Sequence, residues 1–140
     1  MTVLIRMRLL QLVSEAFQAH RLLESRVAGT AGLSAAEVRL LRALGRGASV
    51  SHLARRLGLA RQSVQRVADR LSERGLTRFT QNPDHQRSPI LLPTEAGSRA
   101  RERVERELGD WEARLGELLE PEELETAELV LKGLKSALES

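Results

Sequence analysis

The 140-residue sequence contains no cysteine, which excludes disulfides, a thiol switch and thiolate metal ligands. Its only aromatic residues are Phe17, Phe79 and Trp111, so leucine, valine and alanine must fill the core, which favours a helical architecture. No apolar run reaches the roughly 18 residues that a membrane span requires. The apolar start of the chain is interrupted by Arg6 and Arg8 and has no small-residue cleavage site, so we interpret it as a helix rather than a signal peptide. The composition predicts a single globular, mainly helical protein. Without a membrane span or a signal peptide in this sequence, we expect it to be cytoplasmic.

The sequence also lacks the patterns of an enzyme or a metal protein. No nucleophile lies beside a histidine and an acid, no glycine-rich phosphate loop is present, and no paired carboxylates lie in an apolar setting. The three histidines, His20, His52 and His85, form no ligand cluster in the sequence. We therefore expect no catalytic residues, no cofactor and no metal site.

The net charge of +3 is unevenly distributed. Residues 33–92 carry eleven arginines against four acidic residues, whereas residues 93–140 carry seven basic against thirteen acidic residues. A basic middle segment predicts a local site for a polyanion such as DNA. A proteome that prefers arginine would explain the arginine-to-lysine ratio, but it would not explain this placement.

Residues 49–75 have the pattern of two short helices joined by a tight turn. The first helix, 51–57, ends at Gly58, which suits the positive φ that follows a helix end. We expect Leu59 to return to the core and the second helix to span 61–74. Apolar residues recur on one face of the two helices: Leu53, Ala54, Leu57, Val64, Val67, Ala68 and Leu71.

The other face of the second helix is polar, as expected of a helix-turn-helix that enters the major groove. Glutamine can pair with adenine and arginine with guanine, so Gln62, Gln65 and Arg66 are predicted to contact base edges. Ala60 is a poor N-cap, and a phosphate there would satisfy the free amides. The alternative is a helical hairpin whose polar face is merely solvated. The candidate DNA-binding residues are Arg61, Gln62, Ser63, Gln65, Arg66 and Arg70 on this helix, with Ser63 and Arg70 nearer the backbone, and Ser49 and Ser51 as backbone contacts at the preceding helix.

A basic hairpin is predicted after the second helix. Residues 76–80 alternate apolar and polar side chains, 81–87 contain turn residues, and 88–92 form the returning strand. Pro89 should limit pairing and place this strand at an edge. The candidate DNA-binding residues of this wing are Arg78, His85, Gln86 and Arg87. For Arg78 the alternative is an ion pair with a neighbouring acid that only stiffens the hairpin.

The two ends of the chain carry an excess of apolar residues. The first helix, 3–28, is broken by the glycines at 29–32, and it is too long and apolar for a lone surface helix. A charged helix over 95–119 and an apolar helix from Pro121 follow the wing. The candidate dimerisation residues are Leu9, Val13, Phe17, Trp111, Leu124, Leu131 and Leu134, although Trp111 could instead line a ligand pocket.

Three groups of residues resemble the MarR family of bacterial transcriptional regulators. They are Leu53-Ala54 with Leu57-Gly58-Leu59, the series Val64, Val67, Leu71, Gly75 and Leu76, and the wing from Asp84-His85-Gln86-Arg87 to Leu92, Thr94 and Gly97. The resemblance implies one winged helix-turn-helix domain over 1–140, with a DNA-binding lobe at 33–92 and dimerisation helices at 1–32 and 94–140. It also implies a homodimer that binds a pseudo-palindromic operator, as a repressor relieved by a small ligand. Gln86 departs from the family, because an arginine is common at that place in the wing.

The main competing hypothesis is a winged helix that binds another protein and not DNA. Such a module should present apolar or mixed-charge residues on the second helix, whereas this sequence presents mainly Gln, Ser and Arg there. The sequence therefore favours double-stranded DNA as the partner.

Overall fold

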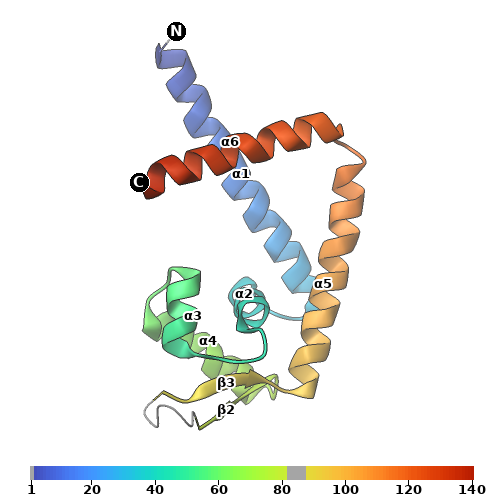
Figure 1. Ribbon diagram of the computed structural model, residues 1–140. Coiled ribbons are helices and arrows are strands. Elements are labelled where there is room, and N and C mark those ends of the chain that lie inside the picture. Colours follow the sequence, from blue (N-terminus) through green and yellow to red (C-terminus); the bar gives the residue numbers. More distant parts are fainter. Residues whose placement is uncertain (1, 82–87) are drawn as a thin grey trace. The chain divides into compact units, whose positions relative to one another are not determined.

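The computed structural model describes residues 2–81 and 88–140, and it is mainly helical with one small antiparallel sheet, as predicted (Figure 1). The chain forms two compact units, Met1–Glu105 and Arg106–Ser140. The elements of the first unit are α1 (Thr2–Ala31), α2 (Ala35–Leu44), β1 (Ala48–Ser49), α3 (Val50–Leu57), α4 (Arg61–Glu73), β2 (Thr77–Thr80), β3 (Ile90–Pro93) and the start of α5 (Glu95–Gly116). The second unit holds the end of α5 and α6 (Pro121–Glu139).

Helix α1 is longer than predicted, because Gly29 stays helical and the helix ends only at Gly32. Gly32 has a φ of +69°, and the Leu33 N–H donates to the Ala28 carbonyl over 2.9 Å. This left-handed termination turns the chain, and it places Leu33 in the core next to Val27 and Ala28.

The predicted capping box opens α2. The Ser34 hydroxyl accepts from the Glu37 N–H at 3.1 Å, and the Glu37 carboxylate accepts from the Ser34 N–H at 3.0 Å. This cap fixes the start of a helix that buries Val38, Leu40, Leu41 and Leu44, which form the centre of the core together with residues from α3, α4 and β3.

The sheet has three strands in the order β1-β3-β2. The predicted two-stranded hairpin is formed by β2 and β3, and a strand that was not predicted, Ala48–Ser49, pairs with Leu91 and Ile90 on its open side. The strand after Pro89 was expected at an edge, but β3 is central. The physical reason is that Pro89 lies just before the first paired residue, Ile90, so its missing N–H costs the ladder nothing.

The junction between the sheet and α5 depends on Thr94 and Gly97. The Thr94 hydroxyl donates to the Gly75 carbonyl at 2.6 Å and accepts from the Gly97 N–H at 3.1 Å, which confirms the predicted N-cap. Gly97 itself lies against the Leu76 backbone, since a Cβ there would meet the Leu76 oxygen at 1.9 Å. This contact joins the end of the helix-turn-helix to the start of α5.

The predicted dimerisation residues are largely solvent-exposed within one chain. Leu9, Val13 and Phe17 on α1 are 39%, 46% and 59% exposed, and Leu124 and Leu131 on α6 are also exposed. Trp111 and Leu134 are half-buried, and the Trp111 ring lies 4.1 Å from the Arg114 guanidinium. Helix α6 begins at Pro121 as predicted.

Arg74 and Glu37 form an ion pair that the sequence pattern did not predict. One Arg74 nitrogen donates to the buried Glu37 carboxylate at 2.9 Å and another donates to the Gly32 carbonyl at 2.8 Å. Burial opposes ionisation of Glu37, but hydrogen bonds from the Ser34 backbone and hydroxyl and the pairing with Arg74 outweigh it, so the pKa of Glu37 is lowered.

We expect Arg74→Ala to lower the free energy of unfolding at neutral pH by about 2 kcal/mol, because it leaves the buried Glu37 carboxylate without its positive partner. The cost stays below that of a fully buried pair because the Arg74 side chain is half exposed to solvent. A carboxylate with a lowered pKa stabilises the fold above its unfolded pKa, and this contribution is lost as pH falls through the folded pKa. The difference between the two proteins should therefore shrink below pH 4.5, the ordinary value for this group. Urea unfolding as a function of pH measures it. Arg99→Ala, which breaks the exposed pair with Glu95, is the control and should change little.

Candidate nucleic-acid interface

The turn between α3 and α4 has the geometry of a helix-turn-helix. Gly58 has a φ of +64°, and the N–H groups of Gly58 and Leu59 donate to the Arg55 and Ala54 carbonyls. This confirms the predicted role of Gly58. The expectation for Leu59 was wrong: its side chain is 44% exposed, because the turn directs it to the surface beside α2 rather than into the core.

Helix α4 has one buried and one polar face, as the spacing predicted. Val64, Ala68 and Leu71 are at most 1% exposed, while Val67 is only half-buried. On the other side, the residues predicted to contact DNA are exposed, except Gln65, which is half-buried: Arg61, Gln62, Ser63, Arg66 and Arg70. The structure thus brings all six candidates of this helix onto one surface.

The start of α4 has no side-chain cap, as expected from Ala60. The Ala60 carbonyl accepts from the Ser63 and Val64 amides, and Arg61 lies in the first turn. The first amides of the helix are therefore available to an external acceptor.

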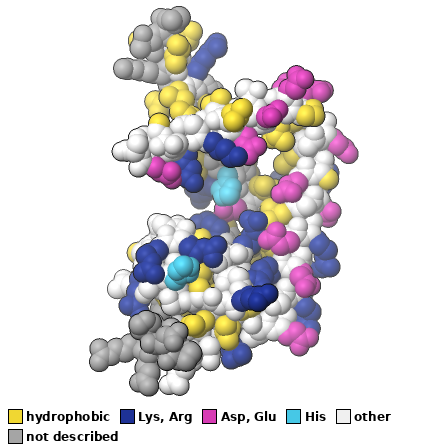
Figure 2. All heavy atoms as spheres, in the orientation of Figure 1, with side chains coloured by type: hydrophobic (Ala, Val, Ile, Leu, Met, Phe, Trp, Pro, Cys, Tyr) yellow, Lys and Arg dark blue, Asp and Glu magenta, His cyan; other side chains and the backbone are white. Residues whose placement is uncertain are grey.

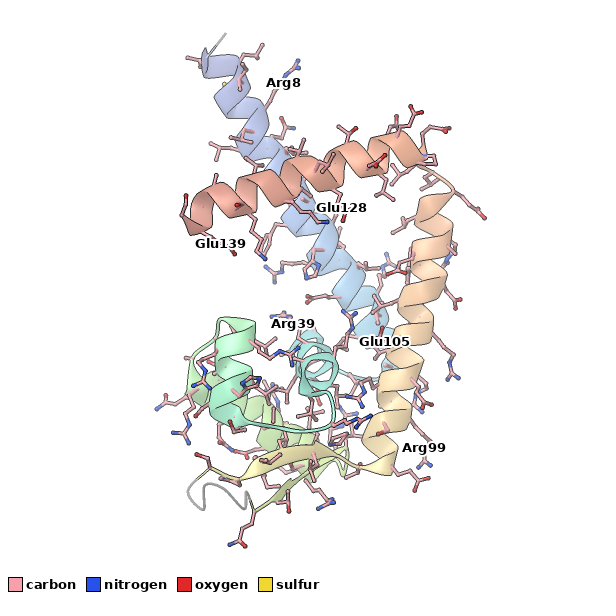
Figure 3. The ribbon with its side chains drawn as sticks, in the orientation of Figure 1. Arg8, Arg39, Arg99, Glu105, Glu128 and Glu139 are labelled. Atoms are coloured by element: carbon pink, nitrogen blue, oxygen red, sulfur yellow. The ribbon has the colours of Figure 1, made fainter. Side chains whose placement is uncertain are left out.

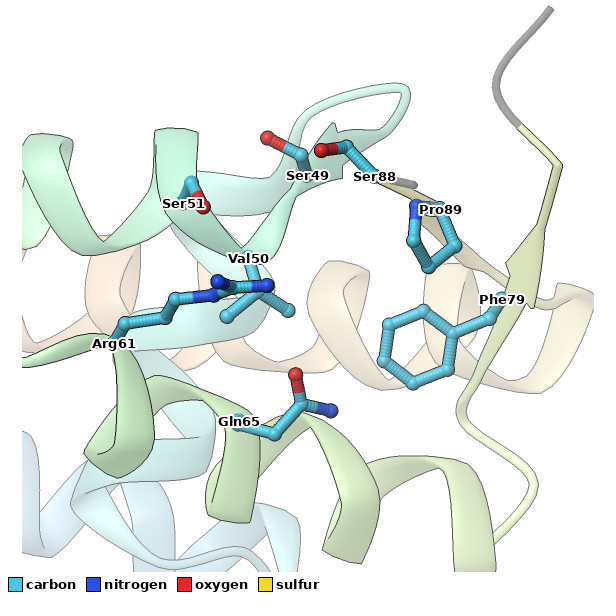
Figure 4. Close-up of a pocket in the computed structure, with 8 residues that line it drawn as sticks. All are labelled: Ser49, Val50, Ser51, Arg61, Gln65, Phe79, Ser88 and Pro89. Atoms are coloured by element: carbon cyan, nitrogen blue, oxygen red, sulfur yellow. The ribbon is translucent and has the colours of Figure 1, made fainter. Parts of the chain in front are cut away.

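A cavity of about 170 Å³ lies between the starts of α3 and α4 and the base of the wing (Figure 4). Its polar lining includes Ser49 and Ser51, the two predicted backbone contacts, together with Arg61 and Gln65. Ser49 also caps α3, because its hydroxyl accepts from the His52 N–H at 3.1 Å. The remaining lining residues are Val50, Phe79, Ser88 and Pro89.

Sequence reasoning missed the wing residues of this cavity, Phe79 and Ser88. The alternation of apolar and polar residues predicted that Phe79 lies on a strand, but it could not predict which residues lie opposite. The register of the sheet shows this: Phe79 pairs with Leu91, and Thr80 pairs with Ile90. Ser88 and Pro89 directly precede β3, and together with Phe79 they form the wing side of the cavity that α3 and α4 also line.

The arginines of the basic segment fall into two groups. Some hold the fold together: Arg39 pairs with Glu24, Arg42 pairs with Glu105, and Arg56 donates to the Ala43 carbonyl. Figure 3 labels Arg39 on α2 and Glu105 on α5. Others make no ion pair or protein hydrogen bond with any described residue, namely Arg46, Arg55, Arg61, Arg66, Arg70 and Arg78. Figure 2 shows arginine side chains gathered on the lobe of α2–α4, and acidic side chains along α5.

The wing is described only at its base. Arg78 is exposed on β2 and forms no ion pair with any residue in 2–81 or 88–140, so the stiffening ion pair finds no support there. The other three wing candidates, His85, Gln86 and Arg87, lie outside the described residues.

The described residues contain no group of three or more His, Asp or Glu side chains placed to hold a metal ion. No helix among them has both the length and the apolar character needed to cross a membrane.

A helix-turn-helix followed by a β-hairpin wing defines a winged helix-turn-helix protein. The family model described as "MarR family" matches residues 31–88. An uncharacterized protein of Mycobacterium tuberculosis is 34% identical over 134 residues, which cover 93% of this chain and 94% of the relative. The chain belongs to the MarR family, and its fold is that of a winged helix.

Solved structures share this fold. The YusO protein of Bacillus subtilis is 27% identical with a TM-score of 0.67, and the match covers 94% of this chain and 95% of that one. A mutant MarR of E. coli in complex with operator DNA is 22% identical with a TM-score of 0.80, and the match covers 91% and 93% of the two chains.

Proposed function

We propose that this protein is a homodimeric, sequence-specific DNA-binding regulator that acts as a repressor and is released by a small ligand. The main observation in favour of DNA binding is the polar face of α4, where Arg61 and the half-buried Gln65 line the cavity at the wing base. Arg66 and Arg70 of the same helix are exposed and pair with no described residue. Amides, hydroxyls and guanidinium groups suit base edges and phosphates. The E. coli relative bound to operator DNA supports the same partner.

The rival function, protein binding without DNA, is less well supported. A protein-binding face of α4 would need an apolar centre to gain affinity by burial. The exposed residues of α4 are all polar or charged, and arginines predominate among its charged residues. The surface therefore favours a polyanion, and it supports a binding protein rather than an enzyme.

The exposed apolar residues of α1 and α6 support the homodimer. A chain of 15.6 kDa that left Leu10, Phe17 and Leu129 in water would expose an unusually large apolar surface. A second copy would cover these residues and would place two α4 helices on two half-sites of a pseudo-palindrome.

We expect the protein to sediment at twice its 15.6 kDa chain mass at micromolar concentration without added ligand. The physical reason is the apolar area that only association can remove from water. Sedimentation equilibrium is the measurement, and a stable folded monomer would contradict both the dimer and the two-half-site model.

A cavity of about 280 Å³ beside α1 and α2 supports the ligand part of the proposal. Its lining combines the Phe17 ring with the guanidinium groups of Arg21 and Arg39, a combination suited to a small aromatic acid. Such a ligand would compete for Arg39, which pairs with Glu24 at 2.8 Å. Titration of candidate acids into the protein–DNA complex tests release.

The function as a whole is tested by selecting bound fragments from the host genome with the full-length protein. Recovery of a shared inverted repeat would support a sequence-specific dimer and identify the regulated genes. Recovery of fragments with no common sequence would contradict the proposal.

We expect Arg78→Ala to weaken DNA binding at low salt without changing base preference, because an exposed arginine at the wing base neutralises phosphate. A dimer loses two contacts, so the slope of log affinity against log salt should become shallower by about two. Arg87→Ala should act in the same way if its wing tip reaches DNA. Arg99→Ala on α5, where Arg99 already pairs with Glu95, is the control and should leave the slope unchanged.

A further inference from the structure

Helix α4 carries a carboxylate in the middle of its DNA-facing surface. Asp69 is exposed and lies one turn after Gln65 and Arg66, and the only other acid of this helix, Glu73, is its last residue. A negative charge that faces a polyanion opposes binding to any sequence. General affinity for DNA therefore cannot explain the presence of Asp69 on this surface.

Asp69 engages an amide rather than an arginine. The Gln65 side-chain nitrogen donates to an Asp69 oxygen at 2.9 Å, and Asp69 forms no ion pair with Arg66, Arg70 or any other described residue. An ionised carboxylate can only accept hydrogen bonds, so this contact determines which end of the Gln65 amide turns toward Asp69.

The contact leaves Gln65 with a defined set of free groups. Its carbonyl oxygen and its second N–H remain available, and the side chain points into the cavity that Arg61 also lines (Figure 4). One acceptor and one donor side by side match the amino group and N7 of adenine in the major groove. Asp69 thus holds Gln65 in the orientation that pairs with adenine.

The second Asp69 oxygen accepts no hydrogen bond from any described residue. The major groove offers it donors only at the amino groups of cytosine and adenine, whereas guanine O6, thymine O4 and the phosphates would repel it. A base pair without a suitably placed amino group is therefore penalised twice, by repulsion and by the loss of a partner for a desolvated charge.

We propose that Asp69 is a specificity-determining residue: it orients Gln65 and restricts the adjoining operator position to a base that presents an amino group. This inference rests on the proposed DNA-binding function. It differs from that function because it assigns selectivity to a residue that lowers general affinity.

The test compares full-length wild type with Asp69→Ala, Asp69→Asn and the control Glu73→Ala, which removes the same charge from the same helix. Wild type first selects duplexes from a randomised library. Each protein is then titrated with the selected duplex and with a shuffled duplex, and each variant repeats the selection. Both changed residues are exposed, so we expect all of the variants to fold. Thermal melts that match wild type verify this.

We expect Asp69→Ala to bind the shuffled duplex more tightly than wild type and to lower the ratio of selected to shuffled affinity by about tenfold or more. Its repeated selection should lose the preference at one base pair of each half-site. Asp69→Asn keeps an acceptor for Gln65 and should fall between the two. Glu73→Ala should raise both affinities together and keep the ratio.

If Asp69→Ala behaves like Glu73→Ala, with an unchanged ratio and selected sequence, Asp69 acts only as a general charge and the inference is wrong. If wild type itself selects no sequence, the proposed regulator function fails, and this inference fails with it. Wild-type selectivity that survives in Asp69→Ala leaves the function standing and removes the inference alone.

Discussion

Gly97→Ala is expected to destabilise the protein by about 3 kcal/mol, the upper end of the usual cost of overpacking. The added methyl group would lie 1.9 Å from the Leu76 carbonyl oxygen, and it would also meet the Leu76 carbonyl carbon at 2.9 Å. These are backbone atoms, so no side-chain rotation relieves the overlap, and α5 must move away from the sheet. That movement would also strain the Thr94 cap, whose hydroxyl joins the Gly97 N–H to the Gly75 carbonyl.

Gly109→Ala, on the same helix, provides a control of the opposite sign. A Cβ at Gly109 meets nothing within 4 Å, so this substitution should stabilise α5 by about 0.5–1 kcal/mol through helix propensity alone. Thermal or urea unfolding at one fixed protein concentration measures both variants, because association adds to apparent stability. Equal effects of the two substitutions would mean that α5 does not approach Leu76 closely.

Local patterns predicted most helix boundaries of this fold. The capping box at Ser34, the left-handed Gly58 and the N-cap Thr94 are features of a few neighbouring residues, so sequence alone was sufficient to predict them. The third strand was missed because β1 has only two residues and exists through its pairing with β3. No periodicity can be detected in so short a segment.

The candidate site was predicted only in part, for a similar reason. Helical spacing placed the candidates of α4 on one face, because that face depends on a single helix. The cavity at the wing base depends on three segments that are distant in sequence, and its Phe79 and Ser88 follow from strand register. The exposure of Leu59 depends in the same way on how the turn packs against α2.

The ion pair between Arg74 and Glu37 shows why the distribution of charge along the sequence could not predict which arginines are paired. These residues are 37 positions apart, and both belong to the basic segment. Sequence alone could not distinguish the arginines that bind carbonyl and carboxylate groups of the protein from those that have no partner among the described residues. The structure makes this separation, and it leaves Arg61, Arg66 and Arg70 together on α4.

Arg66→Ala is expected to lower operator affinity by about 1–3 kcal/mol for each half-site, and a dimer loses this contact twice. Arg66 is exposed at the middle of the polar face of α4, next to Gln65, and no described residue pairs with it. A guanidinium in this position can donate two hydrogen bonds to guanine O6 and N7. Its loss should therefore relax selectivity at one base pair of each half-site as well as weaken binding.

Arg70→Ala is the matched variant, since it removes the same charge from the same helix at a flanking position. If Arg70 contacts only phosphate, its loss should weaken binding to all sequences about equally and should make the salt slope shallower by about two in the dimer. Titrations of both variants against the selected duplex, its single-base variants and a shuffled duplex separate the two roles. Because both variants lose one positive charge per chain, the difference between them isolates the base contact. A uniform loss across all duplexes for Arg66→Ala would show that Arg66 also binds the backbone, and the base-contacting surface of α4 would then consist of its glutamines and Asp69.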